Sequence, residues 1–314
     1  MAMDLYPSRA SDRPRIIPRR EPVLHAPDGA QSAGPLKAAQ LAAYARDGFL
    51  LLEGVLEDQE VRTLQEALAQ ALKAAQGSAA PEVVREPSGE EVRSIFAVHR
   101  DGLWRGLADD PRLRGVAEQL LGGAVYVHQS RINFKPGFTG RDFYWHSDFE
   151  TWHVEDGMPR MRAVSFSVLL DDNEVYNGPL MLIPGSQAHY VACVGKTPEH
   201  HHEQSLRRQE YGIPDRESLT WLCRAQGIAV PTGRAGSVLI FECNTMHGSN
   251  GNITPFARRN AFIVYNSVAN ALEAPFGAPA PRPEYVASRA GIPSATGAAT
   301  RPASIRPVPT SVQA

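Results

Sequence analysis

The sequence contains few cysteines and almost no net charge. Its three cysteines, Cys193, Cys223 and Cys243, form no Cys-x-x-Cys pair. An odd number of separated cysteines argues against a disulfide framework, so we expect a reducing, cytoplasmic location. The formal net charge is −2, and the chain therefore has no overall field that would attract nucleic acid or an anionic membrane surface.

Long hydrophobic runs are also missing. No stretch approaches the roughly 20 apolar residues that cross a bilayer, and the first residues contain no apolar segment of the kind that directs export. Hydrophobic residues still make up 43% of the 314-residue chain, enough for a sizeable core. We therefore expect a protein that binds small molecules and has neither nucleic acid nor membrane as a partner.

Composition divides the chain into three regions. Residues 1–34 are rich in Pro, Arg and Ser without periodicity, which predicts an irregular arm that either drapes over the domain or stays mobile. Residues 35–286 carry helical and strand patterns and are expected to form a single domain. Residues 287–314 are rich in Ala and Pro and predict a flexible tail.

Within 35–286, helical patterns come first and short strands follow. Apolar periodicity predicts helices over 36–47, 58–76 and 101–121. Short apolar or alternating runs predict strands near 49–52, 125–134, 163–170, 180–183, 237–241 and 262–265. This order favours a mainly β protein, a two-sheet sandwich or barrel with helical decoration. A long polar segment, 188–228, interrupts the strands, and its His200-His201-His202 run is expected to be solvated.

The stretch 143–159 carries the first chemical signal. His146 and Asp148 lie two positions apart among aromatic residues, so both would point to the same side if this piece is extended. A hydrogen-bonded His–Asp pair would fit the same pattern. An imidazole and a carboxylate are also two thirds of the 2-His-1-carboxylate set that holds Fe(II) with open positions, and the third ligand must come from elsewhere.

His247 is the best candidate for the third ligand. It follows the predicted strand 237–241, at a position where loops commonly hold ligands. Arg258 begins the return towards the next strand and would come back beside His247, where its guanidinium fork could bind the distal carboxylate of 2-oxoglutarate. Arg259 remains the alternative, because neighbouring strand residues face opposite ways and one step of register decides.

These residues carry a resemblance to a known family. His146-x-Asp148, His247 and Arg258 resemble the iron and 2-oxoglutarate pattern of the phytanoyl-CoA dioxygenase superfamily. The unbroken segment 143–159 resembles the signature of one group within it, the ectoine hydroxylases, and the similarity extends to 129–135, 177–186 and 246–250. The resemblance implies a double-stranded β-helix (jelly-roll, cupin-like) core with the N-terminal helices packed on one sheet.

The resemblance also implies a reaction and a set of site residues. It implies Fe(II)- and 2-oxoglutarate-dependent hydroxylation of ectoine to 5-hydroxyectoine, a compatible solute for osmotic and thermal stress, with O2 consumed and succinate and CO2 released. Iron would be held by His146, Asp148 and His247. The 2-oxoglutarate would be bound by Asn133, Lys135, Ser249 and Arg258. Ectoine would be bound by Gln129, Trp152, Phe241, Phe262 and Arg282.

Several alternatives stay open from the sequence. Arg282 lies between Pro281 and Pro283 and fits a surface residue equally well. Phe143 and Phe149 are expected to wall the pocket and Trp145 to belong to the core. His153 and Cys243 are expected to pack or to support the ligands, because either would be an unusual extra ligand for this set. The substrate could instead be another small zwitterion such as proline, or the fold could be a non-catalytic binding module, and a homodimer is implied by resemblance alone.

Overall fold

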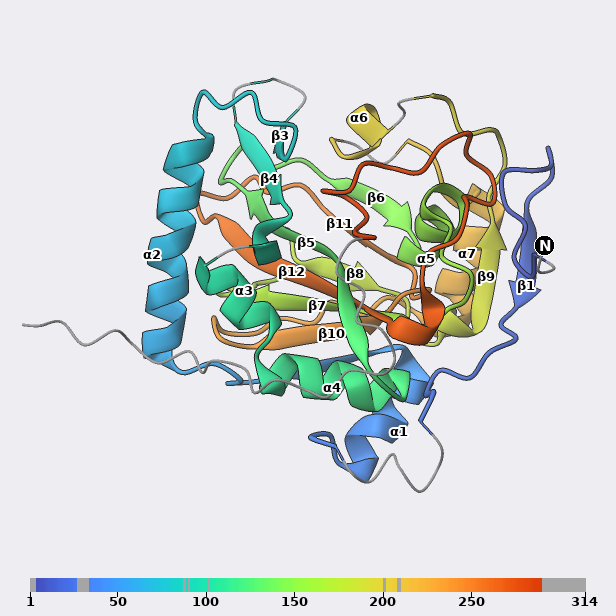
Figure 1. The fold of residues 1–314 in the computed structure, drawn as a ribbon, viewed down its shortest axis with the longest axis horizontal. Helices are drawn as coiled ribbons and strands as arrows, with labels where there is room; N and C mark the ends of the chain where they lie inside the picture. Colours follow the sequence, from blue (N-terminus) through green and yellow to red (C-terminus); the bar gives the residue numbers. More distant parts are fainter. Residues whose placement is uncertain are drawn as a thin grey trace, which may run out of the picture.

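The computed structural model describes residues 4–26, 34–86, 89, 91–100, 102–199, 202–207 and 210–289. Its centre is a seven-stranded antiparallel sheet with a three-stranded sheet beside it (Figure 1). The larger sheet runs through β2 (Phe49–Leu52), β10 (Val238–Glu242), β7 (Ala163–Leu169), β12 (Arg258–Ser267), β5 (Val125–Lys135), β4 (Val92–Phe96) and β3 (Val83–Arg85). The smaller runs through β6 (Phe143–His146), β11 (His247–Ser249) and β8 (Leu180–Leu182).

Apolar side chains join the two sheets. Leu180 and Leu182 of β8 cluster with Leu239, Phe241 and Phe262 of the larger sheet. These residues come from alternate positions along their strands, which places them all on the inner side of the sheet to which they belong. The fold is therefore the predicted mainly β, double-stranded β-helix with helices on one sheet.

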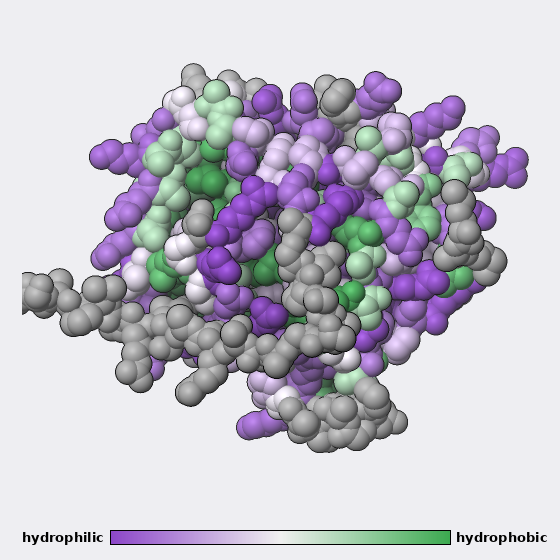
Figure 2. Space-filling model, in the orientation of Figure 1, coloured by the Kyte–Doolittle hydropathy of each residue, from purple (hydrophilic) through white to green (hydrophobic). Residues whose placement is uncertain are grey.

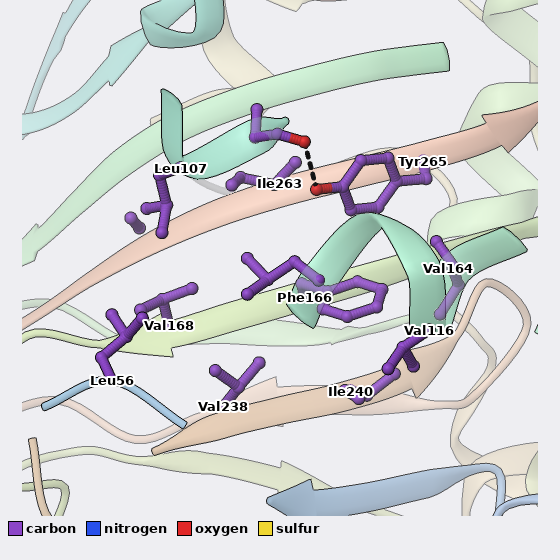
Figure 3. Packing of buried hydrophobic residues seen from close by; sticks show 14 of the residues in the cluster. Leu56, Leu107, Val116, Val164, Phe166, Val168, Val238, Ile240, Ile263 and Tyr265 are labelled. Atoms are coloured by element: carbon purple, nitrogen blue, oxygen red, sulfur yellow. Dashed lines mark hydrogen bonds between the residues drawn. The ribbon is translucent and has the colours of Figure 1, made fainter. Parts of the chain in front are cut away.

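Helices cover the outer face of the larger sheet. They are α1 (Ala38–Asp47), α2 (Asp58–Ala75), α3 (Gly102–Ala108) and α4 (Pro111–Leu121). Figure 3 shows their contact with the sheet: Leu107 of α3 and Val116 of α4 lie over Phe166, Ile240 and other alternate residues of β7, β10 and β12. The hydroxyl of Tyr265 in this layer donates to the carbonyl of Ala108 at 2.7 Å. The outer face of the sheet thus supplies the main hydrophobic core.

The prediction of one helix over 101–121 is wrong. The chain breaks between α3 and α4, where the Asp110 carboxylate accepts the backbone N–H of Arg112 at 2.8 Å. Pro111 takes the first helical position, where its missing N–H costs nothing. A capping aspartate followed by proline starts a new helix, and this local signal outweighs the continuous apolar pattern.

The inner face of the larger sheet is much more polar. Alternation along β5 places Gln129, Arg131, Asn133 and Lys135 on this side, while Ile132 and Phe134 point into the helix-covered core. Lys135 lies opposite Arg258 of β12, and Asn133 lies opposite Asn260. One face of one sheet therefore gathers most of the polar side chains that the resemblance implies for binding.

The described part of the N-terminal region lies against the domain. β1 (Arg15–Pro18) pairs with β9 (His189–Ala192) to form a separate two-stranded sheet, and Tyr6 is fully buried. At the other end, Ala287 and Ser288 are also buried, and Ser288 N donates to His128 O at 2.8 Å. The predicted bounds of arm, domain and tail stay a prediction, because residues 1–3, 27–33 and 290–314 lie outside the described residues.

The polar excursion after β9 contains two helices, α6 (His202–Ser205) and α7 (Arg216–Gln226). Of the predicted solvated histidines, His200 and His201 lie outside the described residues. No helix in the described ranges has the length and apolar character needed to cross a membrane. Figure 2 shows that the face viewed in Figure 1 carries hydrophobic residues in separate patches among hydrophilic ones.

Candidate functional site

Two histidines and one aspartate converge where β6 and β11 pair. His146, the last residue of β6, lies directly opposite His247, the first residue of β11. The Asp148 Oδ1 atom lies 3.6 Å from His146 Nε2 and 3.9 Å from His247 Nε2. One ligand atom from each residue falls within 4.8 Å of the others, a spacing at which a single metal ion can bind all three.

Backbone carbonyls orient both imidazoles. His146 Nδ1 donates to the Tyr144 carbonyl at 2.8 Å, and His247 Nδ1 donates to the Thr245 carbonyl at 2.9 Å. Each Nε2 is therefore left with its lone pair towards the aspartate, as a metal ligand requires. Ser165 Oγ donates to Asp148 Oδ2 at 3.0 Å and fixes the carboxylate. The donor set fits the predicted Fe(II) site.

Asp148 reaches this position by a different route from the one that alternation predicts. Strand β6 ends at His146, and Ser147 caps the short helix α5 (Asp148–Thr151) by accepting the backbone N–H of Glu150 at 3.3 Å. Asp148 is the first residue of that helix rather than part of an extended strand. The predicted shared strand face is thus wrong, although the two side chains still meet.

Burial and neighbouring charges keep His247 and Asp148 unprotonated near neutral pH. Burial, followed by the nearby His146, lowers the pKa of His247 to about 4. Burial alone would raise the pKa of Asp148, but His247, His146 and Arg131 outweigh it and hold that pKa well below its usual range. A carboxylate and neutral imidazoles are the forms that bind a divalent cation.

A buried pair of basic side chains lies beside β11, the strand that carries His247. Lys135 and Arg258 sit on paired positions of β5 and β12, and both are almost fully buried. Lys135 Nζ donates to Ser249 Oγ at 2.8 Å and to Asn250 O at 2.5 Å, whereas Arg258 Nε has no hydrogen-bond partner among the described residues. Two adjacent buried basic groups of this kind favour binding of an anion.

The pKa values of both cations reflect this unbalanced charge. Burial, with Arg258 and Arg93 nearby, lowers the pKa of Lys135 to about 6. Burial, with Arg93 as the next cause, lowers the pKa of Arg258 to about 10. A carboxylate placed between Lys135 and Arg258 would raise both pKa values again.

The register question between Arg258 and Arg259 has a clear structural answer. Arg259 points away from the pocket and makes two hydrogen bonds of 2.6 Å to the Asp171 carboxylate. Arg258 is 2% exposed and lies on the inner face with Lys135. Of the two arginines, Arg258 therefore lies on the inner face that carries Lys135.

A narrow cavity opens next to the metal-ligand triad. Gln129, Trp152 and Arg282, three of the five predicted substrate residues, line it together with His146 and Asp148. The alternative of a surface position for Arg282 is wrong, because this side chain is buried and Asp156 accepts hydrogen bonds from its Nε at 2.8 Å and its Nη2 at 2.5 Å.

The other two predicted substrate residues, Phe241 and Phe262, do not belong to the lining of this cavity. The Phe241 ring packs against His247, with centroids 4.8 Å apart. The Phe262 ring lies under the Arg131 guanidinium, 4.9 Å from its centroid. Asn133, predicted for 2-oxoglutarate, faces the same side and donates to Ser94 Oγ at 3.2 Å.

The aromatic residues of 143–159 have separate positions. Phe143 lines the cavity, as expected. Phe149 does not appear in its lining and packs instead in a fully buried cluster with Tyr6. Trp145 packs against another apolar cluster, and His153 stacks between Phe149 and Phe276. His153 and Cys243 are not among the three metal-ligand candidates.

Arg131 is a site residue that the sequence reasoning missed. Its side chain lines the cavity, donates from Nη1 to Gln129 Oε1 at 3.1 Å and lies over Phe262. Burial lowers its pKa, although the nearby Asp148 acts in the opposite direction. The signal was the strand alternation, which already places Arg131 between Gln129 and Asn133 on one side.

Comparison with known proteins defines the class to which this site belongs. The family model for phytanoyl-CoA dioxygenase (PhyH) matches residues 44–260. The chain belongs to this family.

More specific relatives share a single name. Ectoine dioxygenase from Sphingopyxis alaskensis is 54% identical over 287 residues, covering 91% of this chain and 93% of the relative. Ectoine dioxygenase from Stutzerimonas stutzeri is 52% identical over 290 residues, covering 92% of this chain and 95% of the relative.

Solved structures agree with these sequence matches. The crystal structure of EctD from S. alaskensis with 2-oxoglutarate and 5-hydroxyectoine matches with a TM-score of 0.83 at 50% identity, covering 91% of this chain and 95% of that one. The same protein with bound Fe matches with a TM-score of 0.82 at 49% identity, covering 93% and 96%.

Proposed function

We infer that this protein is an Fe(II)- and 2-oxoglutarate-dependent dioxygenase that hydroxylates ectoine to 5-hydroxyectoine and releases succinate and CO2. The observation that carries this conclusion is the convergence of His146, Asp148 and His247 beside the buried Lys135–Arg258 pair. Relatives that are about half identical over most of the chain act as ectoine dioxygenases. The product is a compatible solute, which suits a role in osmotic and thermal stress.

The triad holds the iron. His146, Asp148 and His247 would supply its three protein ligands. A 2-His-1-carboxylate set of this kind has open positions for a cosubstrate and oxygen. Bound Fe(II) supplies the activation of O2, with 2-oxoglutarate as co-reductant. The protein orients the imidazoles through Tyr144 and Thr245 and the carboxylate through Ser165.

The cationic pocket binds 2-oxoglutarate. Arg258 presents an unpaired Nε and a guanidinium fork that matches a carboxylate. Lys135, on the neighbouring strand β5, adds a second basic group, and Ser249, on β11 of the smaller sheet, adds a hydroxyl. Asn133, on the same face of β5, supplies an amide. This set distinguishes a dicarboxylate from a monocarboxylate, because removing one carboxylate would leave the buried cations uncompensated.

The cavity beside the triad binds ectoine, a ring that carries a delocalised amidinium cation and a carboxylate. The face of Trp152 suits the cation, and the amide oxygen of Gln129 accepts from it. Phe241 and Phe262 act indirectly, through their packing against His247 and Arg131. Arg131 and Arg282 are the two arginines that line the cavity, and both suit the carboxylate. Burial of all these groups keeps water away from the reacting carbon.

A direct assay tests this function. Purified protein with Fe(II), 2-oxoglutarate and O2 should add one oxygen atom to ectoine, detected by mass spectrometry, with one succinate formed per hydroxyectoine. Hydroxylation of proline or another zwitterion without any reaction on ectoine would move the chain to a related dioxygenase. Failure to turn over any substrate, together with no visible Fe(II)–2-oxoglutarate absorption band, would favour a non-catalytic binding module.

The remaining partners and the compartment are part of the same proposal. We propose a cytoplasmic enzyme that needs no nucleic acid. All three cysteines are unpaired in the structure, which supports a reducing compartment. The resemblance alone supports a homodimer, which light scattering on the purified protein would test.

A further inference from the structure

Arg9, in the N-terminal region, lies inside a buried network of charges next to the metal centre. Its Nε and Nη2 donate to the two carboxylate oxygens of Glu150 at 3.0 and 2.6 Å. Its Nη1 donates to Glu155 Oε1 at 2.6 Å. Arg9 is 6% exposed, and Glu150 and Glu155 are 1% and 2% exposed, so solvent contributes little to balancing these charges.

The acidic members of this network lie on the stretch that carries Asp148 and Trp152. Glu150 belongs to α5, and Glu155 and Asp156 belong to the π-helical turn Trp152–Asp156 that continues it. These three buried carboxylates face two arginines, Arg9 and Arg282. Both arginines are needed, because a buried carboxylate is costly without a hydrogen-bonded cation.

Arg9 and Arg282 share one of these carboxylates. Arg282 pairs with Asp156 and also lies 3.6 Å from Glu155 Oε2, on the opposite side of that carboxylate from Arg9. Arg282 lines the cavity. Arg9 and Arg282 therefore balance the charge of Glu155 from its two oxygen atoms, while Asp156 holds Arg282 between the cavity and the carboxylates.

Arg9 also contacts the polar excursion after β9. Its Nη1 donates to Thr197 Oγ1 at 3.0 Å. From further along the same excursion, Gly212 passes so close that a Cβ there would lie 2.3 Å from Glu150 Oε2 and 2.7 Å from Arg9 Nη2. The excursion therefore contacts the Arg9–Glu150 pair through one residue before Leu206 in the sequence and one residue after it. Leu206 itself lines the cavity.

The backbone at Arg9 supports a specific role for this residue. Its φ of 53° lies in the left-handed region that non-glycine residues rarely adopt. The backbone N–H of Arg9 donates to Cys193 O, and Ser8 Oγ donates to Glu150 Oε1 at 2.6 Å. These contacts hold the guanidinium towards the interior instead of the solvent.

We propose that Arg9 is a positioning residue for the hydroxylation: it clamps the turn that carries Asp148 and Trp152 to the excursion after β9 and keeps Arg282 at the substrate cavity. The proposal rests on the proposed function. Without Arg9, Glu150 loses its paired cation and Glu155 keeps only the longer contact with Arg282, which becomes the nearest replacement. A shift of Arg282 towards these carboxylates would disturb ectoine binding. Ser165 would still hold Asp148, and the β6–β11 pairing would still hold His146 and His247.

Other contacts hold the N-terminal region independently of Arg9. Asp4 accepts a hydrogen bond from His153 Nε2 at 3.0 Å, and Arg19 pairs with Glu242 at 2.8 Å. β1 pairs with β9 over four residues. Substitution of Arg9 should therefore remove its contacts with Glu150 and Glu155 without releasing the whole N-terminal region. An effect on positioning can then be distinguished from an effect on folding.

The test compares Arg9→Gln and Arg9→Lys with Arg13→Gln, a substitution at an exposed arginine of the same segment. Arg9→Gln should raise the ectoine KM by roughly tenfold or more and release succinate in excess of hydroxyectoine. Arg9→Lys keeps the charge but loses the bidentate pairing with Glu150. It should therefore raise the ectoine KM and the succinate excess by a smaller amount. Both should keep the visible Fe(II)–2-oxoglutarate band, and Arg13→Gln should match the unsubstituted protein.

The possible outcomes distinguish failure of the positioning role of Arg9 from failure of the proposed function. Folded Arg9 variants with an unchanged ectoine KM and an unchanged succinate-to-product ratio would overturn the positioning role, even if the melting temperature fell. If Arg9→Gln does not fold, Arg9→Lys decides by the same two measurements. If the unsubstituted protein and Arg13→Gln themselves form no hydroxyectoine, it is the proposed function that fails.

Discussion

His146 lies opposite His247 across the β6–β11 pair, with ring centroids 4.2 Å apart and both Nδ1 atoms bonded to backbone carbonyls. The two imidazoles are therefore oriented by the strands themselves, before any ion binds. Asp148 completes the set from the first turn of a helix, held by Ser165. Such preorganisation of the ligands keeps the free-energy cost of binding the ion low.

Removing the carboxylate of the triad should abolish turnover. Asp148→Asn replaces the anion with a neutral amide of the same shape, so we expect at least tenfold weaker iron binding and loss of ectoine-dependent succinate release. Iron titration and a succinate assay measure these effects. Asp142→Asn, at an exposed carboxylate four residues before β6 ends, is the matched control and should leave turnover intact. Turnover by Asp148→Asn would remove this residue from the iron site.

Substitution of Arg258 should weaken binding of the cosubstrate, whereas substitution of Arg259 should affect only the stability of the fold. Arg258→Ala removes the charged partner of a carboxylate, a loss of roughly 1.5–3 kcal/mol that corresponds to a 10- to 100-fold higher 2-oxoglutarate KM. Arg259→Ala removes only the half-exposed pair with Asp171, which stabilises the fold by about 0–1 kcal/mol. Steady-state kinetics on both variants decides. A raised KM in Arg259→Ala alone would reverse the assignment.

Binding of 2-oxoglutarate should be coupled to proton uptake by Lys135. With a pKa of about 6, Lys135 is mostly neutral at pH 7.5 in the ligand-free protein. An anion beside it favours the protonated form, so binding takes up a proton above pH 6 and the affinity falls as the pH rises. Calorimetry in two buffers of different ionisation enthalpy measures this uptake. In Lys135→Met the uptake should disappear; uptake that persists would identify a different group.

Two tryptophans should differ in their effect on ectoine binding. Trp152 is buried and lines the cavity, whereas Trp221 is 45% exposed on α7. Trp152→Ala should raise the ectoine KM by roughly tenfold or more, because loss of an aromatic face over a desolvated cation costs about 2 kcal/mol. Trp221→Ala should behave like the unsubstituted protein. Equal effects in both variants would mean that Trp152 does not contact the substrate.

The main core offers a prediction on stability alone. Tyr265→Phe removes the hydroxyl that donates to Ala108 O and leaves this carbonyl without that partner (Figure 3). We expect a loss of about 1–2 kcal/mol in the free energy of unfolding, measured by urea denaturation, with unchanged kinetics. Tyr176→Phe, at a side chain that is 51% exposed, is the control and should cost almost nothing. A changed ectoine KM in Tyr265→Phe would link the outer core to the site.

Local patterns were enough to predict much of the fold. The alternating run at 125–134 corresponds to β5, and the apolar runs at 163–170 and 237–241 correspond to β7 and β10. Periodicity works here because each strand has one face in the core and each helix has one apolar stripe. It failed at 101–121, where Asp110 and Pro111 start a second helix without changing the apolar spacing.

The sequence by itself determined the chemistry: the residue types and order of His146, Asp148 and His247, and the presence of an arginine shortly after them. Only the tertiary structure decided that Arg258 lies buried beside Lys135 and that Arg259 pairs with Asp171. It also decided that Asp148 lies on a helix and that Arg131 and Arg282 meet at one cavity. The physical reason is that ligand identity is a property of single side chains. Strand register and contacts such as Arg9 with Glu150 depend on how distant segments pack.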